Sequence, residues 1–222
     1  MKVSDALRQR RSIRAFDRRP VDSDLLRSLL DQACRAPSSG NLQPWRIFVL
    51  QGEALVRFRE AMQRRLAEGP APEPRDYAIY PEPLFEPYRG YRFRVGEDMY
   101  RLLGITREDK AARLAWFARN FSFFDAPCAL FFFVDRRMGP GQWADLGMYQ
   151  QSLMLLLKEH GLDSCAQACW ARYPQHVSQW LGASPELMLH CGMAVGYADP
   201  RAAVNQLRSE RMPLKDYCRF ID

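Results

Sequence analysis

The longest uninterrupted apolar run in the chain, residues 126–134, is the feature that most constrains the fold. Its nine residues are too few to cross a membrane, since a helical span needs about 20. Residues 128–134 do not alternate between apolar and polar side chains, so both faces of a strand formed here must be covered. The charged residues Asp135, Arg136 and Arg137 end the run. The run therefore predicts a central strand with covering elements on both sides.

Helical segments supply the cover, and only three or four segments in all, the apolar run included, have strand character. The predicted helices are 4–9, 23–36, a segment around 55–66, 106–121 and 143–160, with N-caps favoured at Ser23 and Thr106 and an end at Gly161. The predicted strands are 46–50, 128–134 and 188–195, and residues 164–169 favour either a strand or an extended loop. These elements predict an α+β fold with a small central antiparallel or mixed sheet flanked by helices.

Two segments differ in character from this body. Residues 69–92 hold six prolines and four tyrosines; the prolines oppose regular secondary structure, and the tyrosines oppose a polar linker. We expect an ordered insert that packs on the body or on a second chain. Residues 198–222 show little periodicity and end in apolar side chains, which predicts a tail that wraps a neighbour. The whole chain, 1–222, is expected to form a single domain with these two additions.

Composition limits what the side chains can do without help. Lys+Arg exceeds Asp+Glu by 32 to 26, and arginine is dense over residues 8–19 and around 201–211. Two separated clusters suit one anionic group held in a fold better than a long nucleic-acid track. The six cysteines and three histidines have no zinc-ligand spacing, so we expect free thiols and no metal site. No secretory signal precedes the first helix, which favours a cytoplasmic protein without membrane contact.

Several enzyme motifs are absent from the sequence. It holds no dinucleotide-binding glycine motif, no Walker loop and no nucleophile elbow. If the chain is an enzyme, a bound cofactor is expected to carry the chemistry, and no side chain is expected to be catalytic by itself.

Four short constellations suit a flat, anionic ligand. Residues 10–14 hold three arginines and a serine, and guanidinium groups match phosphate oxygens. Residues 37–45 hold Ser, Asn and Gln donors with Trp45, residues 161–168 are small, and 196–214 hold Asn205 and further arginines. Taken singly, each also fits an ordinary alternative: a solvated basic face, a helix-to-strand loop or a buried strand with a tight turn.

In this order, the four constellations resemble the nitroreductase family of FMN-dependent oxidoreductases. The resemblance runs from Arg-Arg-Ser-Ile-Arg-Ala-Phe at 10–16, through Ala-Pro-Ser-Ser-Gly-Asn-Leu-Gln-Pro-Trp at 36–45, to Gly-Tyr-Ala-Asp at 196–199 and Arg-Met-Pro-Leu at 211–214. The insert at 69–92 is similar to that of a branch that includes nitrobenzoate reductases. The resemblance implies a three-layer sandwich and a homodimer, with FMN at the interface and the C-terminal tail swapped onto the partner subunit.

The resemblance also implies roles for individual residues. Arg10, with Arg11 beside it, and Ser12 would hold the phosphate and ribityl end, and Arg14 would lie near the N1/O2 edge of the flavin. The second phosphate contact would come from Arg208 or Arg211, and the sequence leaves that choice open. The remaining implied contacts are Asn120, Gln167 and Ala168 around the ring and, from the other subunit, Pro37, Ser38, Ser39, Asn41 and Gln43.

The implied reaction is a ping-pong transfer. NADPH or NADH would reduce the flavin at N5, and an electron-poor acceptor, a nitroaromatic or a quinone, would then take its place, with the 69–92 insert shaping the acceptor pocket. Some relatives carry an acidic residue beside N5; residues 166–169 contain none, so that role does not transfer. The alternatives are a flavin-fragmenting or reductive-dehalogenating enzyme of the same fold, a non-catalytic flavin-binding protein, and a basic nucleic-acid-binding module.

Overall fold

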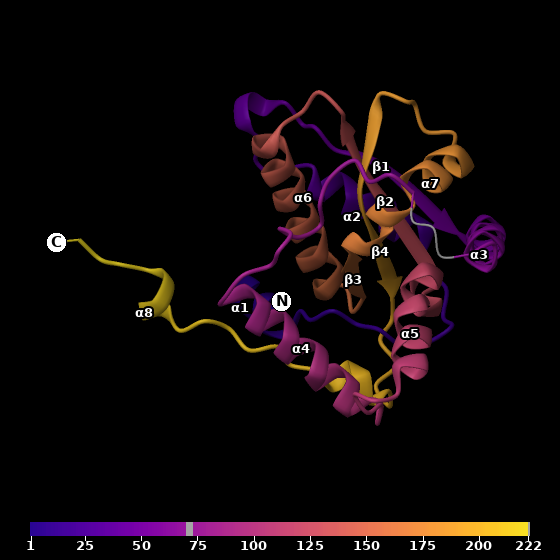
Figure 1. The fold of residues 1–222 in the computed structure, drawn as a ribbon. Helices are drawn as coiled ribbons and strands as arrows, with labels where there is room; N and C mark the ends of the chain where they lie inside the picture. The colour runs from indigo at the N-terminus through magenta and orange to yellow at the C-terminus, as the bar shows by residue number, and fades with distance from the viewer. Residues whose placement is uncertain (70–72, 222) are drawn as a thin grey trace.

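A four-stranded antiparallel sheet lies at the centre of the computed structural model, which describes residues 1–69 and 73–221 (Figure 1). The strand order is β1-β2-β4-β3, and every neighbouring pair is antiparallel. The strands are β1 Arg46–Gln51, β2 Cys128–Asp135, β3 Asp163–Gln167 and β4 Leu187–Gly196. All of the predicted strands are therefore present, and residues 164–167 form a strand rather than an extended loop.

Strand β2 is covered on both faces, as its unbroken apolar run predicts. Residues 128–134 are all 0% exposed. Their side chains alternate between two hydrophobic cores: Leu130 and Phe132 belong to the core that contains Leu29 and Leu153, whereas Phe131 lies in the other core with Phe58. A strand in this position buries apolar surface on each side, which is the main stabilising contribution to such a fold.

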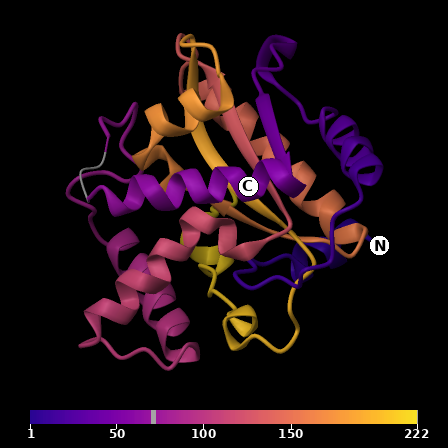
Figure 2. The ribbon, with the colours of Figure 1, turned by 90° about the vertical axis from the view of Figure 1, so that its right-hand side faces the viewer.

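Helices form the outer two layers, so the α+β sandwich is confirmed. Figure 1 shows α2 and α6 beside one face of the sheet, and Figure 2 shows α3 crossing the other. The α-helices are α1 Val3–Gln9, α2 Ser23–Ala33, α3 Gly52–Ala67, α4 Tyr88–Leu102, α5 Lys110–Ala118, α6 Pro140–Glu159, α7 Pro174–Leu181 and α8 Leu214–Tyr217. The 3₁₀ segments are η1 Ser39–Asn41, η2 Arg119–Asp125, η3 Ala168–Arg172 and η4 Ala203–Gln206.

Two predicted N-caps are wrong. Helix α2 begins at Ser23, but its N-cap is Asp22, whose carboxylate accepts from the Leu25 amide at 2.7 Å. The N-cap of α5 is Asp109, which accepts from the Ala112 amide at 2.9 Å, so the predicted capping box at Thr106 does not form. In both cases an aspartate carboxylate satisfies the free amides of the first turn. Helix α2 also ends at Ala33, before the predicted residue 36.

The insert is only partly irregular. Residues 73–87 contain no helix or strand, as predicted, and residues 70–72 lie outside the described part of the chain. Helix α4, however, begins at Tyr88 directly after Pro87, which corrects the prediction of no regular structure up to residue 92. A proline at the start of a helix costs little, because its missing amide would have no partner there. Helix α7, which the sequence analysis missed, begins with Pro174 in the same way.

The C-terminal tail leaves the body of the molecule. Beyond Pro213 it holds the single four-residue turn α8 and extends away from the sheet (Figure 1). Tyr217, Phe220 and Ile221 are 66%, 76% and 88% exposed, so the apolar tip is not covered by the described part of the chain. Among the described residues, no helix is both long and apolar enough to cross a membrane.

Candidate functional site

A basic cavity of about 330 Å³ lies where the N-terminal segment meets the start of the C-terminal tail. Both arginine clusters of the sequence reach this cavity. They are joined by a hydrogen bond between residues 200 apart in the chain, in which the Arg208 guanidinium donates to the Arg8 carbonyl oxygen. The lining residues include Arg8, Arg10, Arg11, Ser12, Arg14, Arg208, Ser209 and Arg211. The structure thus brings together the residues that the sequence analysis assigned to a phosphate.

The segment 10–17 reaches this place by following the edge of the sheet. Ser12 forms a parallel bridge with Ser164 of β3, and the Ile13 amide donates to the Ser164 carbonyl oxygen at 3.0 Å. Further on, Phe16 bridges Ala198 in an antiparallel sense. The arginines of residues 10–14 are therefore fixed to β3 by backbone hydrogen bonds rather than carried on a free loop.

Asn205, a residue without an assigned role in the sequence analysis, joins the tail to this segment. It is 2% exposed. Its Oδ1 accepts from the Arg14 amide at 2.9 Å, and its Nδ2 donates to the carbonyl oxygens of Ala15 at 2.8 Å and Asp199 at 3.0 Å. A side-chain amide has both donors and acceptors, which suits it to bridge two backbone segments. The only sequence signal for this role is an asparagine within the fourth constellation.

The electrostatics of the basic cavity favour an anion. Burial, and then repulsion from Arg211, lowers the pKa of Arg10; burial, and then repulsion from Arg208, lowers that of Arg11. In the described part of the chain, no carboxylate lies within salt-bridge distance of Arg10, Arg11, Arg14, Arg208 or Arg211, whereas Arg8 pairs with Asp5. Clustered guanidinium groups without counter-charges would be stabilised by phosphate oxygens.

Two further cavities lie next to the basic one and share lining residues in sequence. Arg14 lines both the basic cavity and a cavity of about 670 Å³, which in turn shares Tyr80, Arg92 and Asn120 with a third cavity of about 490 Å³. Gln167 and Ala168 line the third cavity. The predicted ring contacts are thus connected to the predicted phosphate contacts through Arg14. Cavities of this size accommodate a cofactor and a small substrate.

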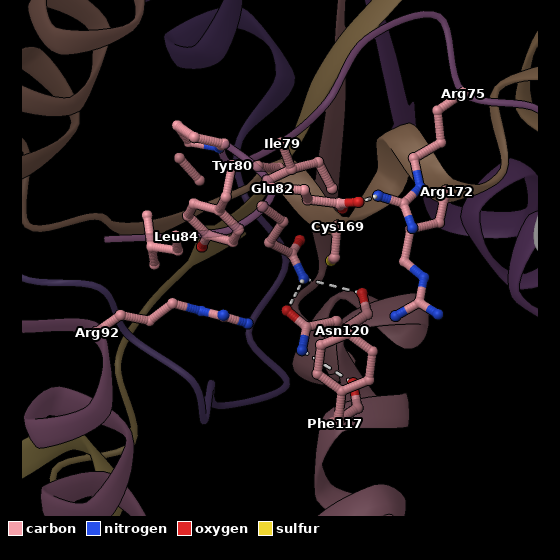
Figure 3. A pocket seen from close by; sticks show the side chains of 14 residues that line it. Arg75, Ile79, Tyr80, Glu82, Leu84, Arg92, Phe117, Asn120, Cys169 and Arg172 are labelled. Carbon is pink, nitrogen blue, oxygen red and sulfur yellow. Dashed lines mark hydrogen bonds and ion pairs between the residues drawn. The ribbon is translucent and has the colours of Figure 1, made fainter. Parts of the chain in front are cut away.

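Figure 3 shows the third cavity from close by. One of the residues that line it, Gln167, has an unsatisfied polar atom. Gln167 is 3% exposed, and its Nε2 donates to the backbone oxygen of Asn120 at 2.8 Å and to its Oδ1 at 3.2 Å. The Gln167 Oε1 is buried and has no hydrogen-bond partner among the residues that the structure describes. A buried acceptor of this kind costs free energy unless a ligand donates to it. The cavity therefore suits a flat ligand with N–H groups on its edge.

The second constellation lies apart from these cavities. Residues 37–43 surround η1 beside the start of α6, where the Ser39 amide donates to both carboxylate oxygens of the buried Asp145 at 3.2 Å. Figure 1 shows the opposite end of α6 lying near α1 and the N-terminus. Within one chain, the predicted contacts of this segment therefore lie away from the arginines. These contacts are Pro37, Ser38, Ser39, Asn41 and Gln43.

The cavity wall includes residues that the sequence analysis did not assign. From the insert come Ile79, Tyr80 and Leu84, and Arg92 comes from α4. Arg172, at the end of η3, borders the same cavity. The resemblance implied that the 69–92 insert shapes the acceptor pocket, but neither it nor the prolines and tyrosines of the insert pointed to these particular residues.

Comparison with known proteins agrees with this geometry. The Nitroreductase family model matches residues 7–197. The chain is 34% identical to the nitrobenzene nitroreductase of Ectopseudomonas oleovorans, over 99% of this chain and 96% of that protein. It is 35% identical to the 4-nitrobenzoate reductase of Pseudomonas putida, over 96% of this chain and 92% of that protein.

Solved structures give the same result. The FMN and NADPH-dependent nitroreductase NfnB from Sphigopyxis sp. strain HMH superposes with a TM-score of 0.97 and 46% identity, covering 100% of both chains. The FMN-dependent nitroreductase NfnB from Mycobacterium smegmatis, solved in complex with NADPH, has a TM-score of 0.91 and 32% identity, again over 100% of both chains. The resemblance seen in the sequence is confirmed: this chain belongs to the Nitroreductase family.

Proposed function

We propose that the protein is an FMN-dependent oxidoreductase that uses NADPH or NADH to reduce electron-poor aromatic acceptors, with nitroaromatics as the principal class. One observation carries the proposal: three neighbouring cavities share lining residues. The first is lined by arginines without counter-charges and shares Arg14 with the second, and the second shares Asn120 with the third, where the buried Gln167 Oε1 has no partner among the described residues. The first suits a phosphate and the third a heterocycle. Relatives named as FMN- and NADPH-dependent nitroreductases support it.

The residues present fit FMN. Arg10, Arg11 and Ser12 would hold the phosphate end, together with Arg208 or Arg211 from the tail; both tail arginines line the basic cavity. FMN bound there would supply the redox chemistry, which is hydride and electron transfer between the nicotinamide and the acceptor. The protein needs no nucleophile of its own for this.

Around the ring, the chain supplies charge and hydrogen bonds. The Arg14 guanidinium, held near the cavity by a bond from its Nη1 to the Ser12 carbonyl oxygen at 3.3 Å, would stabilise negative charge on the ring edge. Asn120 and Gln167 would contact the polar edge, and Gln167 Oε1 would accept a ring N–H. Backbone at Ala168, which is exposed at the cavity, leaves one face open for a second ligand.

A homodimer would complete the site. Residues 37–43 lie away from the arginines of their own chain, and Asn41 and Gln43 are exposed with positive φ angles of 55° and 48°. The tail carries exposed Tyr217, Phe220 and Ile221 away from the body. Both features are explained if each chain donates residues 37–43 to the site of a second copy and covers that copy with its tail.

The test is to purify Ser12→Ala and Arg14→Ala variants and to measure FMN per chain, FMN affinity and NADPH-dependent reduction of a nitroarene. Both variants are expected to bind FMN at least tenfold more weakly, since each loses a contact to the ligand. Arg8→Gln is the matched control, because Arg8 lines the same cavity but is paired with Asp5. Unchanged FMN content and turnover in both variants would contradict the assigned site.

A further inference from the structure

Arg172 has a buried polar atom that none of the described residues satisfies. It borders the cavity that also contains Gln167, and its Nε is buried without a hydrogen-bond partner in that part of the chain. Within residues 1–69 and 73–221, no carboxylate lies within salt-bridge distance of its guanidinium; in the same cavity Arg75 has such a partner, Glu82, at 3.6 Å. A partly buried guanidinium without a counter-charge is costly and marks a place for an anionic ligand.

The backbone of Arg172 is held in place by neighbouring segments. The Arg172 carbonyl oxygen accepts from the Glu73 amide at 3.2 Å, and the Glu73 carboxylate accepts from the Gln175 and His176 amides at 2.6 and 3.2 Å. The Arg172 Cζ lies 5.7 Å from the centre of the Phe117 ring. The insert and the start of α7 therefore fix the backbone of Arg172, which lowers the cost of ordering it around a ligand.

The remaining wall suits an aromatic ring. Figure 3 shows Arg172 and Arg92 on opposite sides of the cavity, with Asn120 between them. Ile79, Leu84 and Phe117 add apolar surface. The lining holds Arg75, Arg92 and Arg172 against one acidic residue, Glu82, which is already paired. A ring that carries a negative group is therefore favoured over a neutral one.

We propose that Arg172 binds a carboxylate on the aromatic acceptor, so that the enzyme prefers nitroaromatic acids to neutral nitroarenes. The inference rests on the proposed function and names its substrate class. The planar fork of a guanidinium matches a carboxylate in a bidentate manner. Sequence similarity does not decide between neutral nitroarenes and nitroaromatic acids, because relatives at 34% and 35% identity are named for nitrobenzene and for 4-nitrobenzoate. The positive charge of the cavity favours the acids.

The kinetic test compares 4-nitrobenzoate with methyl 4-nitrobenzoate, which has the same ring but no charge. Wild type is expected to show the higher kcat/KM for the acid. Arg172→Gln is expected to lower the acid-to-ester ratio of kcat/KM by about 10- to 100-fold, the effect of losing a charge-assisted hydrogen bond. Arg172→Lys should recover part of the ratio. Arg75→Gln, the control in the same cavity, should change the ratio by less than about twofold, because Glu82 already neutralises Arg75.

A binding measurement keeps this inference separate from the proposed function. Calorimetry with benzoate and methyl benzoate on the FMN-loaded protein, with FMN content matched between variants, needs no turnover. Arg172→Gln should weaken benzoate at least tenfold and leave the ester unchanged. Equal benzoate affinity in wild type and Arg172→Gln would overturn the inference. The inference would also be overturned if Arg172→Gln left the acid-to-ester ratio of kcat/KM unchanged and raised the KM for NADPH but not for NADH. Arg172 would then bind the phosphate of the cosubstrate. Absence of NADPH oxidation with every acceptor would count against the proposed function instead.

Discussion

Gln167 and Asn120 are joined by two hydrogen bonds that fix the polar side of the cavity. The Gln167 Nε2 reaches the Asn120 backbone oxygen at 2.8 Å and its Oδ1 at 3.2 Å, so the end of β3 is tied to η2. Because both hydrogens of the amide are used, only the Gln167 Oε1 remains for a ligand. Asn120 in turn donates from Nδ2 to the Phe117 carbonyl oxygen at 2.9 Å. The orientation of both amides is thereby set before any ligand binds.

This arrangement predicts that Gln167→Leu impairs both stability and catalysis. The substitution keeps the size of the side chain but removes the donor to two acceptors on Asn120, which should lower the free energy of unfolding by about 1–2 kcal/mol. It also removes the proposed acceptor for the flavin, so kcat/KM with NADPH should fall at least tenfold. Urea unfolding and steady-state kinetics measure the two effects. Normal kcat/KM at full FMN content would show that Gln167 does not contact the cofactor.

Arg10 is predicted to favour the cofactor at the expense of the apoprotein. Its pKa is lowered by burial and then by Arg211, so its charge is unfavourable until an anion binds. Arg10→Gln should therefore leave the Tm of the apoprotein unchanged or raise it, while FMN binds about 10- to 100-fold more weakly. Thermal unfolding with and without FMN measures both. Arg8→Gln should change neither FMN affinity nor the gain in Tm on FMN addition; if it matches Arg10→Gln, general surface charge rather than a specific site is responsible.

Asn205→Ala is predicted to separate the two arginine clusters. The variant leaves the Arg14 amide without its acceptor, and it removes one of the two donors to each of the Ala15 and Asp199 carbonyl oxygens, which keep the amides of Asp199 and Ala202. We expect a loss of about 2–3 kcal/mol in the free energy of unfolding and a weaker FMN complex. Denaturant unfolding and FMN titration provide the measurements. A destabilised variant with unchanged FMN affinity would mean that the tail arginines do not need Asn205 for their position.

Gly192 is predicted to be irreplaceable in β4. A Cβ built there would lie 2.3 Å from Cδ1 and 2.7 Å from Nε1 of Trp170, a 0% exposed core residue. Gly192→Ala should cost about 1–3 kcal/mol, because the indole must move within a packed core. Gly141→Ala in α6, where no atom lies within 4 Å, is the control and should stay within about 0.5 kcal/mol of wild type. Equal stability of both variants would contradict the packing described here.

Two partly buried histidines predict a loss of stability in mild acid. Burial lowers the pKa of His190 and of His176, so the unfolded chain takes up protons first as the pH falls below about 6.5. The free energy of unfolding should be constant above that pH and decline below it by at most about 1.4 kcal/mol per pH unit for each histidine. His190→Asn should flatten the decline. An identical pH profile in wild type and His190→Asn would show that His190 is not the source.

The sequence predicted the parts of the fold whose patterns are local. The apolar run of β2 predicted a strand covered on both faces, and both cores confirm it. Helix α4 could not be predicted in this way, because none of its residues is buried and its first turn lies in the proline-rich insert. It is held by contacts such as the bidentate pair between Arg113 and Glu97, at 2.6 and 3.0 Å, which join α4 to α5. Such contacts depend on tertiary structure and leave no periodic signal.

The candidate site divides in the same manner. Arg10 and Arg14 stand in a recognisable motif, and their meeting with Arg208 was predicted from charge alone. The contact between Gln167 and Asn120 joins residues 47 apart and depends on how η2 packs beside β3, so residue types alone cannot reveal it. Arg172 has no motif around it, and its importance follows only from the burial of its Nε and the lack of a partner.

The most direct measurement of the central claim is an absorbance spectrum of the purified protein from about 300 to 600 nm, before and after addition of NADPH or NADH under anaerobic conditions. The account predicts flavin bands that bleach when the nicotinamide is added and return when 4-nitrobenzoate follows. A protein that is colourless, and that stays so after incubation with FMN, would contradict the account.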